Sequence, residues 1–244
     1  MKIAIFIPAY NASRTLPLLI DRIPKEIKKK VKEIFVFDDA SQDNTYLVGV
    51  GYKNLTGLSN LKVYKNEKNK GYGGNQKYAY QYAIKKDFDL VVMLHGDAQY
   101  APEFIPILLK PFERDPNIAL VFGSRMTGKP LKGGMPLYKF IGNKILTFIE
   151  NKVLNINLSE YHSGFRVYNV NKLTQIPFHL CSGSWHFDTE ILIQLKMKNF
   201  KIFERPIPTY YGHEKCHVNI LNYGLNILKS LLEYKLHTLG IKKY

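Results

Sequence analysis

Residues 3–11 read IAIFIPAYN, five apolar residues followed at once by a proline, a tyrosine and an asparagine. A continuous apolar run of this length that ends in turn residues is typical of a strand buried on both faces. Four further runs have the same form, and segments with helical spacing alternate with them. We therefore expect strands over 3–7, 34–37, 61–64, 90–94 and 118–122, with helices over 14–29, 75–86 and 102–112. This alternation predicts an α/β fold with one Rossmann-like, mostly parallel sheet flanked by helices.

The second half of the sequence is less regular. It predicts helices over 138–152 and 186–198, a short strand over 201–203, and a loop over 128–134 that is rich in glycine and lysine. Neither an internal repeat nor a low-complexity linker interrupts it. We therefore expect residues 1–217 to form a single domain.

Residues 218–244 are expected to add a C-terminal amphipathic helix. Its leucines recur at spacings of three or four, at Leu221, Leu225, Leu228, Leu232, Leu236 and Leu239. The ordinary interpretation is a helix packed on the domain or on a partner subunit. The alternative is a helix lying on a membrane surface, assisted by Lys229, Lys235, Lys242 and Lys243.

Composition narrows the class of protein. The 244 residues contain 35 Lys and Arg against 20 Asp and Glu, a net charge of +15, and 45% are hydrophobic, which excludes a disordered chain. The two cysteines, Cys181 and Cys216, exclude a disulfide scaffold or a zinc module and favour a reducing, cytoplasmic compartment. No run of 18 apolar residues predicts a membrane span. The positive charge indicates an anionic partner: nucleic acid, a membrane face or a phosphorylated substrate.

Polar residues gather at the end of each expected strand. Because ligands of open α/β sheets bind beyond the carboxyl ends of the strands, these clusters predict a binding site along one edge. The clusters lie at residues 8–11, 38–45, 69–75, 95–100 and 123–125. The glycines of 71–74 precede a helix, so their amides can face an anion, although no known phosphate-loop spacing is present.

Asp97 follows an apolar strand, where a carboxylate is costly unless it binds something. Together with Gln99 it can hold a hard divalent cation. The other interpretation is a carboxylate that caps the following helix.

Seven sequence blocks occur in a familiar order: IPAYN, FDDASQDNT, NKGYGGNQKYAY, HGDAQYAPE, GSR, HSGFRVY, and FDTEI with ERPIPTYY. Over about residues 1–210 the chain resembles the inverting family 2 glycosyltransferases of GT-A fold. Within them it is most similar to the dolichol-phosphate or polyprenol-phosphate mannose and glucose synthases.

The resemblance implies a role for each block. Asp39, or Asp38 in its place, contacts the base or ribose, and Arg125 faces the diphosphate or donor sugar as a catalytic residue. Asp188 and Glu190 match the helix that supplies a catalytic base. The nucleotide-sugar pocket is implied at Pro8, Tyr10, Asn11, Asp38, Asp39, Gly71, Asn75, Gly96, Asp97 and Arg125; the metal site at Asp97, Gln99 and His95; and the acceptor site at His162, Ser163, Arg166 and Lys215.

Two departures from the family pattern affect the metal and acceptor sites. His95 stands where the family has the first acid of its D-x-D triplet, so it can ligate Mn²⁺, bond a phosphate, or be an ordinary buried histidine. The segment after the last strand lacks the family's arginine. Lys215, His213 or His217 can bind an anion there instead.

The implied function is Mg²⁺- or Mn²⁺-dependent inverting transfer of a sugar from a UDP- or GDP-type donor in cell-envelope glycan synthesis. A lipid-phosphate acceptor is already ionised, whereas a hydroxyl acceptor needs a base, for which Asp188 is the first choice and Glu190 the second. The basic segment 129–144 is expected to close over the donor or hold an anionic acceptor.

Two other functions stay open, a nucleotidyltransferase and an inactive sugar-nucleotide-binding module. A nucleotidyltransferase needs a glycine-rich basic loop after the first strand, where IPAYN stands. We expect the protein to have no nucleic-acid partner. We expect it to contact the cytoplasmic membrane face peripherally, and a homo-oligomer stays open.

Overall fold

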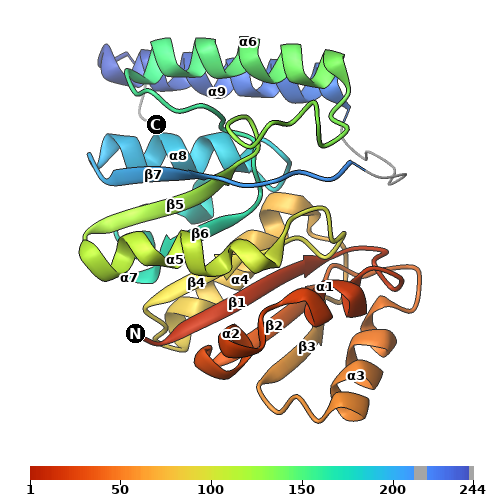
Figure 1. Ribbon diagram of the computed structural model, residues 1–244. Coiled ribbons are helices and arrows are strands. Elements are labelled where there is room, and N and C mark those ends of the chain that lie inside the picture. Colours follow the sequence, from red (N-terminus) through yellow and green to blue (C-terminus); the bar gives the residue numbers. More distant parts are fainter. Residues whose placement is uncertain (212–218, 242–244) are drawn as a thin grey trace.

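A computed structural model describes residues 1–211 and 219–241, and within them the chain forms one seven-stranded sheet (Figure 1). The strand order is β3-β2-β1-β4-β6-β5-β7. β6 runs antiparallel to its neighbours β4 and β5, and the remaining pairs are parallel, which confirms the mostly parallel sheet. The strands are β1 (Ile3–Ala9), β2 (Glu33–Asp38), β3 (Leu61–Lys65), β4 (Leu90–Met93), β5 (Ile118–Ser124), β6 (Arg166–Asn169) and β7 (Lys201–Pro206).

The described helices are α1 (Leu16–Arg22), α2 (Lys25–Lys30), α3 (Thr45–Thr56), α4 (Gly71–Lys85), α5 (Ile105–Arg114), α6 (Leu137–Leu154), α7 (Val170–Leu173), α8 (Phe187–Met197) and α9 (Ile220–Thr238). Short 3₁₀ turns occupy Pro102–Phe104 and Phe178–Leu180. The single helix expected over 14–29 is wrong, because the chain divides there into α1 and α2. Ile23, which precedes Pro24, is extended (φ −61°, ψ 124°), as the proline ring demands of the residue before it.

Each face of the sheet carries its own apolar core. Ile3, Ile5 and Ile7 of β1 join the core under α1, α2 and α5. Ala4 and Phe6, on the other face of the same strand, join the core under α4 and α8. Successive strand side chains point to opposite faces, so a continuous apolar strand is what a sheet covered on both sides requires.

Helices α6 and α9 lie side by side outside α8 and form an outer layer (Figure 1). Ile227 and Leu231 of α9 are buried in the core beneath them. The expected leucine face does not make this contact. Leu221, Leu225 and Leu232 are exposed. What these leucines contact stays a prediction. Ile227 and Leu231 lie on a different side of the helix, and this side packs on the core.

Candidate active site

The loops after β1 and β2 are bonded to each other at the carboxyl edge of the sheet. The Asn11 amide donates to Ser41 Oγ (2.9 Å), and Asn11 Oδ1 accepts from the Gln42 amide (2.9 Å). Asn11 has a φ of +51°, a left-handed conformation that asparagine tolerates better than most residues. Tyr10 is exposed beside it and Pro8 is half-buried. These hydrogen bonds join the loops after β1 and β2, which hold two of the expected polar clusters. The two loops together form one wall of the site.

Asp38 and Asp39 end up in different environments. Asp39 Oδ1 accepts from Asn66 Nδ2 (2.8 Å) and the Lys70 amide (2.9 Å), so this carboxylate is used within the protein. Asp38 is fully buried and accepts from the amide and hydroxyl of Ser41. Its Oδ2 has no hydrogen-bond partner among the described residues. A buried oxygen without a donor calls for an explanation, and a donor from a bound ligand is one.

The glycine cluster at the start of α4 is a packing device. The amides of Gly73 and Gly74 donate to the carbonyl of Gly183 (2.9 and 3.2 Å). A Cβ on Gly73 would lie 2.4 Å from the carbonyl oxygen of Ser182. Gly71 donates to Asn69 Oδ1 (2.9 Å). These amides therefore already have protein acceptors, and the role of Gly71 in nucleotide-sugar binding stays a prediction. Asn75, on the same helix, is buried and donates to the Phe37 carbonyl (3.0 Å).

Asp97 lies in the loop after β4, half-exposed at the same edge. Its Oδ1 accepts from the Gln99 amide (3.1 Å), and the Gly96 amide donates to the Pro8 carbonyl (3.0 Å), so the loop is tied to β1. Among residues 1–211 and 219–241, no group of three or more His, Cys, Asp and Glu can hold a metal alone. One accessible carboxylate nevertheless fits Mg²⁺, which is usually held by one or two carboxylates together with substrate phosphates and water.

His95 is held between two aromatic rings. Tyr72 and Tyr100 meet its imidazole edge-on, with ring centroids 5.4 and 5.3 Å away. Its Nε2 lies 3.1 Å from the Tyr72 hydroxyl. Burial lowers the pKa of His95, which keeps the ring neutral at neutral pH. Gly164 of the HSGFR block packs on this ring, since a Cβ there would lie 2.1 Å from Nε2.

Asp188 is the centre of a buried polar network. Its Oδ2 accepts from the Tyr72 hydroxyl (2.8 Å), and its Oδ1 accepts from Gln76 Nε2 (3.4 Å) and pairs with Arg166 Nη1 at 3.5 Å. Tyr72 also stacks on Trp185 at 4.5 Å. Burial, and then the charge of Asp188, hold the pKa of Tyr72 well above its usual range. The sequence analysis missed Tyr72, although it lies inside the GYGGN cluster.

Glu190 lies two residues after Asp188 and has other partners. Its Oε2 accepts from the Ser182 amide (2.6 Å), and its Oε1 accepts from Ser230 Oγ of α9 (3.2 Å). The carboxylate joins the loop before α8 to the outer layer. Its role as the second choice of base stays a prediction.

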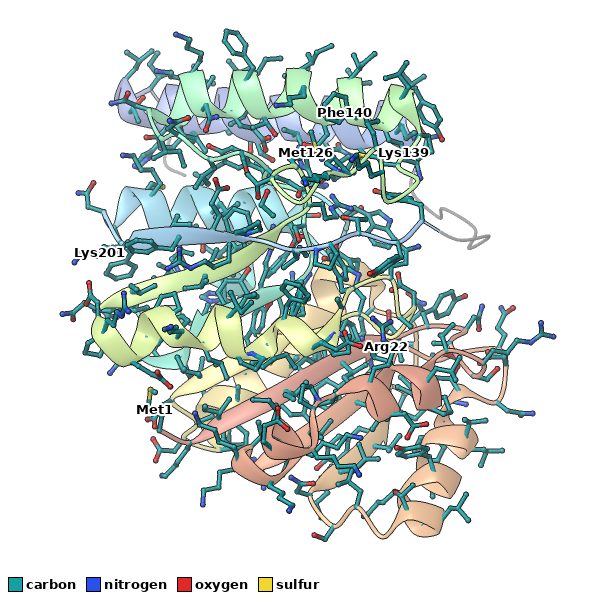
Figure 2. All side chains as sticks on the ribbon, viewed as in Figure 1. Met1, Arg22, Met126, Lys139, Phe140 and Lys201 are labelled. Atoms are coloured by element: carbon teal, nitrogen blue, oxygen red, sulfur yellow. The ribbon has the colours of Figure 1, made fainter. Side chains whose placement is uncertain are left out.

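Arg125 forms a buried ion pair with Glu160. Arg125 Nε donates to Glu160 Oε1 (2.8 Å), and Nη1 donates to the Tyr211 hydroxyl (3.2 Å). Burial alone would raise the pKa of Glu160, but the charge and hydrogen bonds of Arg125 outweigh it and hold this pKa below its usual range. The arginine side chain keeps 14% exposure, whereas that of Glu160 has none. Figure 2 labels Lys139 and Phe140, which lie at the start of α6, and Met126, which follows Arg125 in the chain.

The expected acceptor residues are mostly buried. Arg166 donates to the carbonyls of Ser163 and Tyr161 (both 2.7 Å) and is 1% exposed. His162 Nδ1 lies 2.9 Å from the Tyr223 hydroxyl of α9, and its Nε2 lies 3.3 Å from Glu150 Oε2. The sequence analysis missed Glu150, because a charged residue inside a helix is ordinarily solvated. Their acceptor roles stay predictions, and Lys215, His213 and His217 lie outside the described residues.

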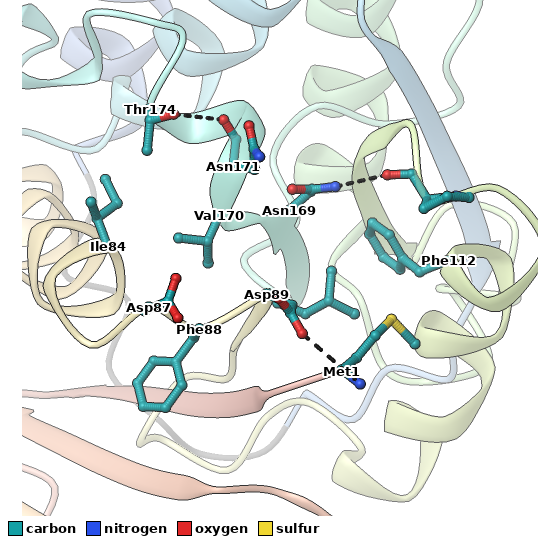
Figure 3. Close-up of a pocket in the computed structure, with 12 residues that line it drawn as sticks. Met1, Ile84, Asp87, Phe88, Asp89, Phe112, Asn169, Val170, Asn171 and Thr174 are labelled. Carbon is teal, nitrogen blue, oxygen red and sulfur yellow. Dashed lines mark hydrogen bonds and ion pairs between the residues drawn. The ribbon is translucent and has the colours of Figure 1, made fainter.

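A cavity of about 490 Å³ lies at the opposite, amino edge of the sheet (Figure 3). Met1, Asp89 and Asn169 line it, and the amino group of Met1 lies 3.9 Å from Asp89 Oδ2. None of the expected site residues contributes to it. The chemistry-bearing side chains therefore gather at the carboxyl edge, as the sequence predicts for an α/β sheet.

Comparison with curated proteins identifies the family. The model of "Glycosyl transferase family 2" matches residues 4–176. The chain is 29% identical over 219 residues, 86% of each chain, to the UDP-N-acetylglucosamine–dolichyl-phosphate N-acetylglucosaminyltransferase of Methanococcus voltae. It is 34% identical over 148 residues to the low-salt glycan biosynthesis hexosyltransferase Agl6 of Haloferax volcanii, covering 59% of this chain and 34% of that one.

Solved structures confirm the fold. The glucosyl-3-phosphoglycerate synthase of Mycobacterium tuberculosis in complex with UDP superposes with a TM-score of 0.72 at 19% identity, covering 99% of this chain and 81% of that one. The same enzyme has been solved with Mn²⁺ or with Mg²⁺ beside UDP. The sheet, the site at its carboxyl edge and the family match agree with the resemblance seen in the seven sequence blocks. The chain belongs to glycosyl transferase family 2, has the GT-A fold and is a glycosyltransferase.

Proposed function

We propose that this glycosyltransferase moves a sugar, with inversion, from a nucleotide-diphosphate sugar to a polyprenyl phosphate in a metal-dependent reaction. The observation that carries the proposal is the state of Asp188. Both of its oxygens are engaged, by Tyr72 on one side and by Gln76 and Arg166 on the other. Neither oxygen is left free to take a proton from an acceptor hydroxyl, as a catalytic base must. An acceptor that is already ionised needs none.

The relative from Methanococcus voltae supports a lipid-phosphate acceptor, since its name couples a UDP-sugar with dolichyl phosphate. A lipid substrate also agrees with action at the cytoplasmic membrane face. No helix in the described ranges is long and apolar enough to cross a membrane.

On the donor side, we assign the nucleoside to the wall formed by the loops after β1 and β2. Asp38 Oδ2, buried without a partner, can accept from the base or ribose. Asp97 and Gln99 would hold the divalent ion, which supplies positive charge against the leaving diphosphate. Arg125 lies at the same edge with 14% of its side chain exposed and can add a fixed charge there.

Acceptor profiling tests the proposal. The protein is incubated with UDP- and GDP-sugars and Mg²⁺ or Mn²⁺, with polyprenyl phosphate, the matching polyprenol, or a sugar as acceptor. We expect nucleoside diphosphate release and a glycosylated lipid only with polyprenyl phosphate. Transfer only to the polyprenol or the sugar would overturn the assignment.

The Asp188→Asn variant sharpens the test. If Asp188 only positions Tyr72 and Arg166, the variant keeps the shape of the pH–rate profile while kcat falls. If Asp188 is the base for a hydroxyl acceptor, the limb of the profile that reports the base disappears.

A further inference from the structure

The outer sides of α6 and α9 are lined by large apolar residues. On α6 they are Leu137, Ile141, Ile145 and Phe148; on α9 they are Leu221, Leu225, Leu228 and Leu232, with Leu239 directly after the helix. All nine are between 41% and 79% exposed. We call these nine residues the α6–α9 face. Monomeric proteins rarely expose an apolar patch that spans two helices, so this face indicates a binding surface.

The α6–α9 face is distinct from the packing surface of the same helices. Glu150 and Leu154 of α6, and Ile227 and Leu231 of α9, are buried toward the sheet. The apolar residues of the face recur at spacings of three or four on the other side of each helix. Gly224 of α9 neighbours Leu146 of α6, since a Cβ at Gly224 would be in ordinary contact with Leu146 Cδ2, at 4.0 Å. Two adjacent helices packed on one core thus turn their second apolar sides outward together.

The charges around the face are positive. The exposed charged residues of the two helices are Lys144 and Lys152 on α6 and Lys229 and Lys235 on α9. Of the carboxylates, Glu150 is buried and Glu233 is half-buried. Apolar side chains ringed by lysines are typical of helices that lie in the interface of an anionic bilayer. A second copy of the chain would place lysines against lysines, so the charge favours the lipid.

We propose that the α6–α9 face docks the protein on an anionic lipid bilayer, with both helices lying in the plane of the interface. Both helices begin on the side of the molecule toward which β1 points (Figure 1). Lys139 of α6 lies over the Tyr211 ring (5.4 Å to its centroid), and Tyr211 bonds Arg125. Arg125 therefore lies near the start of one of the two helices that docking would place on the lipid. The link to a lipid acceptor rests on the proposed function, whereas bilayer binding does not.

Vesicle flotation without donor or acceptor tests the docking directly. We expect the protein to float with phosphatidylcholine vesicles that contain about 30% phosphatidylglycerol, and much less with pure phosphatidylcholine. The variants Leu225→Gln/Leu232→Gln and Ile141→Gln/Phe148→Gln each remove apolar surface from one helix. Each should weaken binding at least about tenfold, because affinity scales with the apolar area inserted. Leu47→Gln/Leu55→Gln on α3 is the matched control, since these leucines are equally exposed elsewhere.

Two charge-reversal variants complete the test. Lys229→Glu/Lys235→Glu should reduce binding to anionic vesicles, whereas Lys25→Glu/Lys29→Glu on α2 should not. Thermal melting of every variant checks the fold. Binding by the α9 leucine variant equal to that of wild type would overturn the proposal. So would a dimer, seen by sedimentation velocity and dissociated by the leucine substitutions, in a protein that does not float. A protein that floats but transfers no sugar would contradict only the proposed function.

Discussion

At the scale of single residues, the site is built on buried charges held in pairs. Arg166 faces Asp188, Arg125 faces Glu160, and His162 lies beside Glu150. Burying one charge is costly unless a partner compensates it. The sequence motifs mark Arg125, Arg166 and Asp188, but Glu150 and Glu160 lie outside any recognisable cluster. Their partners come from distant segments, so no local pattern reveals them.

The Arg125–Glu160 pair predicts a stability that depends on pH. Glu160→Gln leaves a buried guanidinium without its counter-charge and should lower the free energy of unfolding by about 3–5 kcal/mol. The folded-state pKa of Glu160 is lower than its unfolded value. Its contribution is therefore present above the unfolded pKa and is lost as pH falls through the folded one.

Urea denaturation between neutral pH and pH about 3 measures this contribution. The loss of stability on acidification should be smaller in Glu160→Gln than in wild type. If the free energy of unfolding falls equally with pH in the two proteins, the ion pair contributes nothing to stability. Glu67→Gln serves as the control, because Glu67 is exposed and forms no ion pair with any residue that the structure describes.

Gly164 predicts a second effect at this scale. A Cβ at this position would lie 2.1 Å from His95 Nε2, and the ring is held by Tyr72 and Tyr100. Gly164→Ala should destabilise the protein by about 1–3 kcal/mol, as overpacking does. His95→Ala removes the obstacle, so Gly164→Ala should cost much less in that background. An equal cost in both backgrounds would contradict the contact.

At the scale of elements, the continuous apolar strands were predictable because burial on both faces demands them. β1, β2, β3, β4 and β5 lie within a few residues of the expected ranges. α3 and β6 were missed. α3 contains Gly49 and Gly51 among β-branched residues, which weakens its helical signal. β6 has four residues and begins with Arg166, whose burial depends on Asp188 from α8.

The packing at the start of α4 predicts how a substitution there changes the stability of the protein. Gly73 touches the chain before α8, where a Cβ would meet backbone at 2.4 Å, so Gly73→Ala should destabilise by about 1–3 kcal/mol. Gly51 of α3 has nothing within 4 Å of its Cβ position. Gly51→Ala should therefore stabilise by about 0.5–1 kcal/mol. Thermal and urea unfolding compare the two variants, and a stabilising Gly73→Ala would refute the packing role.

At the scale of the whole molecule, the sheet brings five separate loops to one edge, and Asp97 is the carboxylate there that fits a shared divalent ion. We expect EDTA to abolish turnover and the thermal stabilisation that a nucleotide-sugar provides. Asp97→Asn should reduce kcat at least about 100-fold, in the range found for groups that serve a catalytic metal. Asp87→Asn, at the opposite edge, should have no effect. Full activity of Asp97→Asn would exclude the metal role.

The sequence by itself determined the α/β class, the edge that carries the site and the family, because strand hydrophobicity and short polar motifs are local properties. Only the tertiary structure decided which partner each polar group has. It paired the Gly73 and Gly74 amides with Gly183, tied Asp188 to Tyr72 and Arg166, and left Leu221, Leu225 and Leu232 of α9 exposed. The physical reason is that burial and hydrogen bonding depend on segments distant in sequence. A helix with two apolar sides shows which one is covered only when its neighbours are in place.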